Sequence, residues 1–306
     1  MAKTRPLNEL DFKIASLYKE GKRIFEIVKE INCELKEDAV RKSLIKQDLW
    51  KTSVCKATYD MDKLLNLHTN NEGWYLIGLL LADGSVSPTK ISDTGKVYKK
   101  VIWEIDIKDV DSMIKIRDYF FPNSKLYYRK NRPLVSLNIN KTELVDYLDR
   151  FGIQTNKREA TMPCICQSLL KERDFALSFI AGYMDGDGCI SINNTDGGSR
   201  LNVTAATPVW KEIKKVFDFV GFTYSEDTKH STYVSCNFNN PVKSLSLLIE
   251  CYNSTDLVFD RRKARLKDVI TKTLQSEIRY SKYIESLRFA DKTGYFLENV
   301  PKINKP

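Results

Sequence analysis

Residues 76–84 of this chain have the sequence LIGLLLADG, and residues 180–188 have the related sequence IAGYMDGDG. Each stretch is an apolar run with small residues four positions apart. Each ends in Asp-Gly and is followed by a short run typical of a β-strand. Two copies of one unusual pattern predict a duplicated fold, so the repeat organises everything else in the chain.

The small residues predict a close contact between two helices. Gly78 and Ala82 lie four positions apart, as do Gly182 and Gly186, so each predicted helix has one smooth side. Glycine inside a helix costs about 1 kcal/mol relative to alanine, so its presence needs a packing reason. Two smooth sides allow the helix backbones to approach closely. We therefore expect the two helices to pack face to face.

That contact would bring two carboxylates together at the helix ends. Asp83 and Asp187 occupy the same position in the two copies. Two carboxylates at the negative ends of two helices repel each other, and a divalent cation with oxygen ligands relieves the repulsion. We expect a shared Mg²⁺ site formed by Asp83 and Asp187, in the neighbourhood of Gly84 and Gly188. The two glycines are expected to adopt the left-handed conformation that often ends a helix.

The paired motif resembles the LAGLIDADG homing endonucleases, a family named after the consensus of this helix. The resemblance covers residues 72–270. In that family the eighth position is catalytic and the sixth is variable. The sixth position is Leu81 in one copy and Asp185 in the other, and we expect Asp185 to be a hydrogen-bonding or helix-end residue rather than a metal ligand.

The rest of the sequence predicts an α+β fold of two pseudo-symmetric αββαββα repeats. Hydrophobic residues alternate in residues 101–108, as in a half-buried strand, and helical and strand-like segments then follow in the same order in both copies. The resemblance implies that the strands form an antiparallel, saddle-shaped DNA-binding surface. The expected parts are a helical module with a linker (1–56), repeat 1 (57–157), repeat 2 (158–270), and a C-terminal helix over 271–289 with an irregular tail (to 306).

The N-terminal module has the pattern of a helix-turn-helix. Three short helices are expected, with residues 37–48 as the recognition helix and Val40 and Leu44 facing inward. The residues expected to contact DNA are Arg41, Lys42, Lys46 and Gln47. A plain three-helix cap would have a similar sequence, and that alternative stays open.

The predicted strands carry short amides and hydroxyls on one face, which suit the base edges of a major groove. The expected contacts on this face are Ser136, Asn138, Asn140, Asn193, Arg200, Asn202, Thr204, Ser235, Asn237 and Asn239. Basic residues near strand ends are expected to bind phosphates, namely Lys99, Lys125, Arg129, Lys130 and Arg132. An ordinary solvated sheet and ordinary surface charge are the competing interpretations.

A basic residue follows each repeat at a similar distance from its aspartate. In the resembled family each half often places a basic residue near the scissile phosphate. Lys157 and Lys263 are the candidates for this catalytic role, with Arg158 and Arg262 as alternatives. Such residues would stabilise charge on the phosphate or polarise the attacking water. A solvated basic run is the other interpretation.

Composition agrees with a polyanionic partner, since the net charge is +9. The seven cysteines are scattered and suggest reduced thiols, and the longest apolar run is too short to span a bilayer. We therefore expect a cytoplasmic protein.

The resemblance implies a monomeric, site-specific endonuclease that makes a staggered break in double-stranded DNA at a long, largely asymmetric target. It implies Mg²⁺ as cofactor, with Mn²⁺ able to substitute and Ca²⁺ binding without supporting cleavage. The expected role is to spread an intron or a free-standing gene. Two alternatives stay open: an intron RNA-splicing maturase, and a transcription regulator built on a retired nuclease scaffold.

Overall fold

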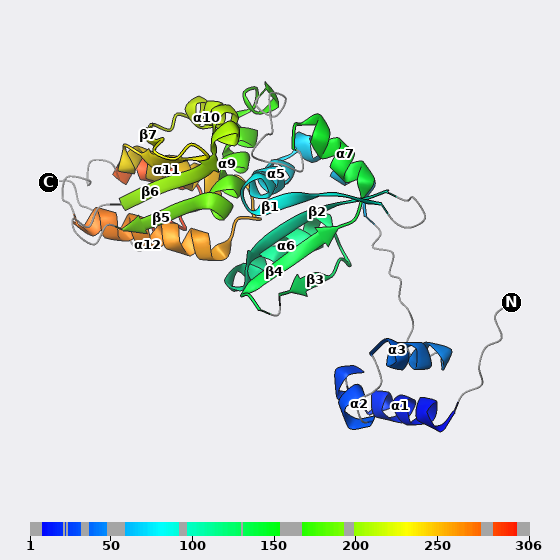
Figure 1. The fold of residues 1–306 in the computed structure, drawn as a ribbon. Helices are drawn as coiled ribbons and strands as arrows, with labels where there is room; N and C mark the ends of the chain where they lie inside the picture. The colour runs from blue at the N-terminus through cyan, green and yellow to red at the C-terminus, as the bar shows by residue number, and fades with distance from the viewer. Residues whose placement is uncertain are drawn as a thin grey trace. The chain divides into compact units, whose positions relative to one another are not determined.

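A computed structural model describes residues 8–20, 22, 24–31, 37–47, 59–91, 97–129, 131–153, 167–192, 199–276 and 284–298. The chain forms two compact units, Met1–Thr58 and Tyr59–Pro306. Their helices and strands are shown in Figure 1. Each unit has its own hydrophobic core.

The first unit contains α1 (Glu9–Lys19), α2 (Ile24–Ile31) and α3 (Glu37–Lys46). Asn8 caps α1, because its side chain accepts a hydrogen bond from the Asp11 backbone while the Asp11 side chain accepts one in return. The core consists of Ile14, Leu17, Ile27, Val40 and Leu44. The prediction that Val40 and Leu44 face inward is confirmed.

The second unit begins with two short helices and then contains repeat 1. The elements are α4 (Met61–Leu64), η1 (Leu67–Thr69), α5 (Asn71–Asp83), β1 (Gly84–Ile91), β2 (Val97–Asp106), η2 (Ile107–Asp109), α6 (Val110–Phe120), β3 (Leu126–Tyr128), β4 (Leu134–Ile139) and α7 (Thr142–Arg150).

Repeat 2 has the same order of elements and two further helices. They are α9 (Arg173–Asp187), β5 (Gly188–Ile192), β6 (Ser199–Ala206), α10 (Thr207–Val220), β7 (Tyr224–Asp227), β8 (Tyr233–Phe238) and α11 (Pro241–Tyr252), followed by α12 (Asp260–Ser276) and α13 (Ile284–Ala290).

Each repeat forms one antiparallel four-stranded sheet. The strand orders are β1-β2-β4-β3 and β5-β6-β8-β7, which are the same arrangement in the two halves. The register is also the same, because Gly84 pairs with Trp103 and Gly188 pairs with Val203. The predicted αββαββα duplication is therefore confirmed, and the pseudo-symmetry extends to single residues.

Helices α5 and α9 lie side by side between the two sheets (Figure 1). A Cβ atom on Gly78 would overlap the carbonyl oxygen of Phe179, and a Cβ atom on Gly182 would overlap that of Tyr75. The two backbones therefore touch through the glycines, as the small residues predicted. Large side chains such as Trp74 and Phe179 fill the space on either side.

The expectation of left-handed glycines at the helix ends is wrong. Gly84 has φ −96° and Gly188 has φ −83°, and both lead directly into a strand. Glycine is needed there for space instead. A Cβ atom would overlap the Leu80 side chain at Gly84 and the Met184 carbonyl oxygen at Gly188.

Two element boundaries also differ from prediction. Strand β2 ends at Asp106, whose side chain accepts a hydrogen bond from the Lys108 backbone and starts a turn, so Ile107 is 41% exposed. The C-terminal helix begins at Asp260 rather than at 271, because the first residues of α12 are held by contacts with both repeats. The tail was expected to be irregular. Its described residues 291–298 form turns, and the Phe296 side chain among them is buried in the core.

Candidate functional site

Asp83 and Asp187 lie at the ends of the two touching helices. A Cβ atom on Gly186 would lie 3.3 Å from Cγ of Asp83, so the Asp83 carboxyl group sits against the backbone next to Asp187. Burial is the main reason why the pKa of Tyr183 is raised well above its usual value, and the charges of Asp187 and Asp83 add to the effect. The negative charges of both acids therefore act on one tyrosine hydroxyl.

These two acids fit a hard divalent cation. Asp83 is exposed and Asp187 is half-buried, so solvent reaches the pair. Mg²⁺ in proteins is often held by one or two carboxylates, with water and substrate phosphate completing the octahedron. Nowhere in the described part of the chain, this site included, does a group of three or more His, Cys, Asp or Glu side chains form that could hold a metal ion.

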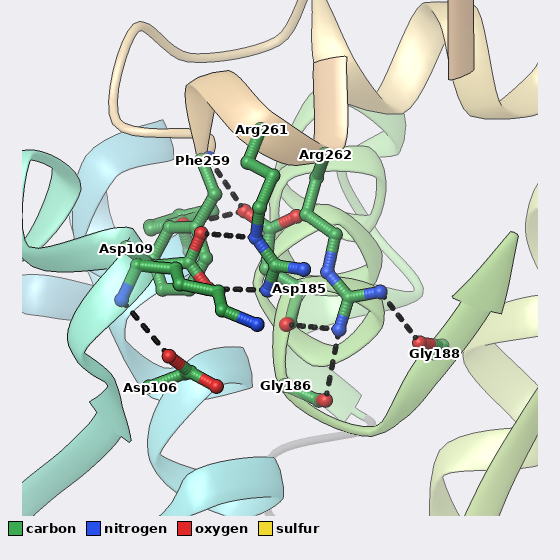
Figure 2. A network of polar contacts seen from close by, with 10 residues as sticks. Asp106, Asp109, Asp185, Gly186, Gly188, Phe259, Arg261 and Arg262 are labelled. Atoms are coloured by element: carbon green, nitrogen blue, oxygen red, sulfur yellow. Dashed lines mark hydrogen bonds and ion pairs between the residues drawn. The ribbon is translucent and has the colours of Figure 1, made fainter. Parts of the chain in front are cut away.

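Asp185, the sixth residue of the second motif, is a buried hydrogen-bond acceptor (Figure 2). The Tyr75 hydroxyl donates to its Oδ2 at 2.7 Å, and the Phe259 backbone N–H donates to the same oxygen at 2.8 Å. Burial raises the pKa of Asp185 to about 7, although these hydrogen bonds and Arg262 act in the opposite direction. Its side chain lies inside the protein, in agreement with the expected hydrogen-bonding role.

The first turn of α12 contacts both repeats (Figure 2). Arg262 donates from Nη1 to the Gly188 carbonyl at 3.0 Å and from Nη2 to the Asp185 carbonyl at 3.0 Å. Arg261 donates from Nε to Oδ1 of Asp109 at 2.7 Å and makes a second bond to Oδ2. Asp109 belongs to repeat 1 and is 5% exposed, so this ion pair joins the two halves.

Lys263 is half-buried, and burial lowers its pKa. The charged groups with the largest influence on it are Asp256, Asp260, Lys115 and Asp185. Of the basic candidates after repeat 2, Arg262 is the one that contacts the backbone beside Asp187. The corresponding candidates after repeat 1, Lys157 and Arg158, lie outside the described residues.

In repeat 2 the predicted polar face forms continuous rows. Asn202 pairs with Asn237 across β6 and β8, and Asn237 pairs with Ser225 on β7. One row further along, Thr204 pairs with Ser235. These predicted side chains are half-buried, and Arg200 and Asn239 at the edges are exposed. Asn193 lies outside the described residues.

In repeat 1 the polar face is interrupted, and the expectation for Ser136 needs correction. Ser136 is 1% exposed and its hydroxyl contacts the Tyr127 carbonyl at 3.4 Å. It is paired with Glu104 on one side and Tyr127 on the other, and Arg129 donates from Nε to Glu104 at 2.8 Å. Ser136 is therefore enclosed by neighbours. Asn138 is half-buried and Asn140 is exposed.

The basic residues of repeat 1 separate into two groups. Lys125, Arg129 and Arg132 are exposed, and Glu104, Arg129, Asn131 and Arg132 line a hollow of about 350 Å³. The prediction that Lys99 binds a phosphate needs correction. Lys99 lies on the same side of β2 as Val101 and forms a 2.7 Å ion pair with Asp146 of α7. It faces the helices rather than the polar face. Lys130 lies outside the described residues.

In the first unit, Lys42 is exposed on α3. The prediction that Gln47 contacts DNA needs correction. Its side-chain amide donates to the Asp11 carbonyl at 2.7 Å, which is a contact within the module. The side chains of Arg41 and Lys46 lie outside the described part of the structure.

Sequence reasoning missed the contacts that hold the end of α9. Tyr75 and Phe259 are far from Asp185 in the sequence, and Asp109 is far from Arg261, so no local pattern joins these partners. One signal was present: Asp185 is an acid directly after the mostly apolar run of residues 175–184, and a buried acid needs hydrogen-bond donors.

Solved structures similar to this chain include LAGLIDADG homing endonucleases, the family that the paired motifs resemble. The I-LtrWI enzyme bound to target DNA has a TM-score of 0.48 and 12% identity, covering 74% of this chain and 97% of that chain. I-SmaMI bound to uncleaved DNA with calcium has a TM-score of 0.46 and 12% identity, covering 71% and 97%. I-DmoI in complex with DNA and calcium has a TM-score of 0.47 and 14% identity, covering 66% and 99%.

No protein-family model matches the sequence. A reverse gyrase of Methanocaldococcus jannaschii is 29% identical over 119 residues, which are 39% of this chain and 6% of that protein. The match therefore spans a small part of the gyrase. None of the described helices is both long enough and apolar enough to cross a membrane.

Proposed function

We propose that this protein is a site-specific endonuclease that hydrolyses both strands of double-stranded DNA with Mg²⁺. One observation carries the proposal: Asp83 and Asp187 end two helices whose backbones touch, so that the Asp83 carboxyl lies against Gly186, the residue before Asp187. Two acids fixed by backbone contact are suited to two cuts at a constant spacing.

Asp83 and Asp187 would each help to hold Mg²⁺ against one strand of the DNA. Bound there, Mg²⁺ would neutralise charge on the scissile phosphate and lower the pKa of a neighbouring water molecule. The contribution of the chain is to keep both carboxylates close together and open to solvent. The Arg262 guanidinium, a cation beside the negative end of α9, would offset part of the repulsion between them. Lys263 and Lys157 remain our candidates for a basic group near the phosphate.

The polar strand faces would contact the DNA. Short amides and hydroxyls on β6 and β8 suit hydrogen bonds to base edges, and the exposed Arg129, Arg132 and Lys125 suit phosphates. The halves differ at equivalent positions, since the register places Ile102 where repeat 2 has Asn202 and Glu104 where it has Thr204. Different side chains in the two halves favour an asymmetric target, and one chain containing both halves favours a monomer.

The first unit would add DNA contacts through α3, where Lys42 is exposed. A helix-turn-helix module in the same chain as a nuclease would extend the bound sequence and raise affinity.

The proposed role of the endonuclease is to spread an intron or a free-standing gene.

A cleavage selection tests the proposal. The purified chain is incubated with a library of double-stranded DNA in Mg²⁺, in Mn²⁺ and in Ca²⁺, and cleaved ends on both strands are sequenced. We expect one long site with staggered ends in Mg²⁺ and Mn²⁺, and binding without cleavage in Ca²⁺. Binding to DNA without cleavage in any metal would favour the regulator alternative, and selective binding to a folded intron RNA would favour a maturase.

A further inference from the structure

Arg262 contacts the backbone on both sides of Asp187. Its Nη2 donates to the carbonyls of Asp185 at 3.0 Å and Gly186 at 3.4 Å, and its Nη1 donates to the carbonyl of Gly188 at 3.0 Å (Figure 2). The last carbonyls of a helix have no partner within the helix. A planar guanidinium with donors at fixed angles can satisfy several of them at once.

We propose that Arg262 is a positioning residue that holds the end of α9, and with it Asp187, for cleavage of one DNA strand. This inference rests on the proposed endonuclease function. It assigns to Arg262 a role different from that of a basic group touching phosphate, because both of its terminal nitrogens already donate to backbone carbonyls.

Arg262 is itself held from two directions. The Asp185 carboxylate accepts a hydrogen bond from the Phe259 backbone, and the Arg262 backbone N–H donates to the Phe259 carbonyl at 2.9 Å in the first turn of α12. The neighbouring Arg261 is fixed by its two bonds to Asp109. The start of α12 therefore cannot shift without breaking contacts to both repeats.

The geometry makes the effect local. Arg262 contacts carbonyls at residues 185, 186 and 188, and its bonds do not reach α5. Loss of these bonds should loosen Asp187 more than Asp83. In an enzyme with one acid assigned to each strand, that difference appears as unequal cutting of the two strands.

Arg265 is a matched control on the same helix. Its Nε donates to the Ile190 carbonyl at 3.2 Å and its Nη1 donates to Asp268 at 3.1 Å. It is also an arginine bound to the backbone of β5, but the carbonyl lies beyond the residues that flank Asp187. A general effect of removing an arginine from α12 would appear in both variants.

The first experiment measures the cutting rate of each strand separately, with end-labelled DNA, for wild type, Arg262→Gln and Arg265→Gln. Asp187→Asn identifies the strand that depends on Asp187. In Arg262→Gln we expect that strand to be cut about 100-fold more slowly, the cost of a 1 Å misplacement, while the other strand keeps its rate and nicked DNA accumulates. Arg265→Gln should cut both strands at the wild-type ratio. Equal slowing of both strands by Arg262→Gln would overturn the positioning role.

Arg262→Lys separates charge from geometry. Lysine keeps the positive charge but lacks the planar fork, so we expect it to show the same strand imbalance as Arg262→Gln. Recovery of the wild-type strand ratio by lysine would mean that charge alone matters. This variant also decides the question if Arg262→Gln does not fold.

A second experiment does not depend on cleavage. Amide hydrogen exchange is measured in the free protein for the segment that contains residues 186–188 and for the equivalent residues 82–84. We expect several-fold faster exchange at 186–188 in Arg262→Gln and unchanged exchange at 82–84, with Arg265→Gln unchanged in both, because its backbone contact lies at Ile190. Unchanged exchange at 186–188 would overturn the hold on α9. A wild-type chain that cuts no DNA but shows this exchange pattern would count against the endonuclease function alone.

Discussion

Gly182 and Tyr75 touch backbone to backbone, because a Cβ atom on Gly182 would overlap the carbonyl oxygen of Tyr75. The reciprocal contact is between Gly78 and Phe179. The pairing of the two repeats therefore depends on positions where no side chain fits.

Gly182→Ala should separate α5 from α9. We expect the free energy of unfolding to fall by about 3 kcal/mol, the upper end of the usual cost of overpacking, and Gly78→Ala to behave alike. Thermal or urea unfolding measures this. The exposed α10 substitution Lys211→Ala is the control and should change stability by less than about 0.5 kcal/mol. Wild-type stability in both glycine variants would show that the helices can separate without cost.

Asp83→Asn and Asp187→Asn should each abolish double-strand cleavage while leaving DNA affinity within a few-fold of wild type. Each substitution keeps the shape of the side chain but removes the charge that would hold Mg²⁺. The measurement is cleavage of the selected site together with a binding titration in Ca²⁺. Asp174→Asn is a matched control, because Asp174 is an exposed acid in the first turn of the same α9 helix. Cutting of both strands by either active-site variant at the wild-type rate would rule out these acids.

Asp185 should make stability depend on pH in metal-free buffer. Burial raises its pKa in the folded protein to about 7 from an ordinary value of 3.8. The folded state therefore binds the proton more tightly, so this contribution to stability is fully present below about pH 4 and is lost as pH rises through about 7. Relative to Asp185→Asn, the wild type should lose stability over that interval. The exposed Asp174→Asn should give a curve parallel to wild type, and a parallel curve for Asp185→Asn would contradict the prediction.

Asn237→Ala should relax recognition at one or two base pairs. Asn237 lies in the middle of a polar row on the sheet of repeat 2, between Asn202 and Ser225. Loss of a base contact costs about 1–3 kcal/mol in discrimination at the contacted pair. Cleavage of a library with every single-base change in the target measures this, with Asn66→Ala, an exposed asparagine outside the sheets, as control. An unchanged preference at every position would exclude Asn237 from base recognition.

Removal of residues 1–58 should weaken DNA binding and flatten its salt dependence, because fewer phosphate contacts release fewer counterions. Cleavage should still occur at the same bond at higher protein concentration. Within the module, Lys42→Ala should reduce the slope of log affinity against log salt by about 1, whereas Gln47→Ala should leave the slope unchanged. Gln47 is the informative comparison because its amide is bound to the Asp11 carbonyl. Equal affinity and slope for the full and shortened chains would leave the module without a role in DNA binding.

The repeated architecture could be predicted from the sequence because its cause is local and periodic. The spacing of Gly78, Ala82, Gly182 and Gly186 predicts the helix contact, and alternating strand residues predict the sheets. The face of β2 on which Lys99 lies could also be predicted from the alternation of the strand, because Lys99 is two residues before the buried Val101.

Features that depend on distant partners could not be predicted. The start of α12 at Asp260 depends on Asp185 and Asp109, which lie in different repeats. The burial of Ser136 depends on the Glu104–Arg129 ion pair beside it. Such contacts form only after the chain has folded, and no local pattern records them.

The glycine contact between α5 and α9 also separates two properties that an endonuclease must combine. In the proposed enzyme, the distance between the two cuts is fixed by the width of two bare helix backbones, whereas the choice of bases depends on side chains that project from the strands. Substitutions on β4, β6 or β8 could then redirect the protein to new DNA sites without altering the length of the overhang it leaves. In the proposed enzyme, the α5–α9 contact would set the spacing of the cuts, and the strand side chains would set the sequence that is bound.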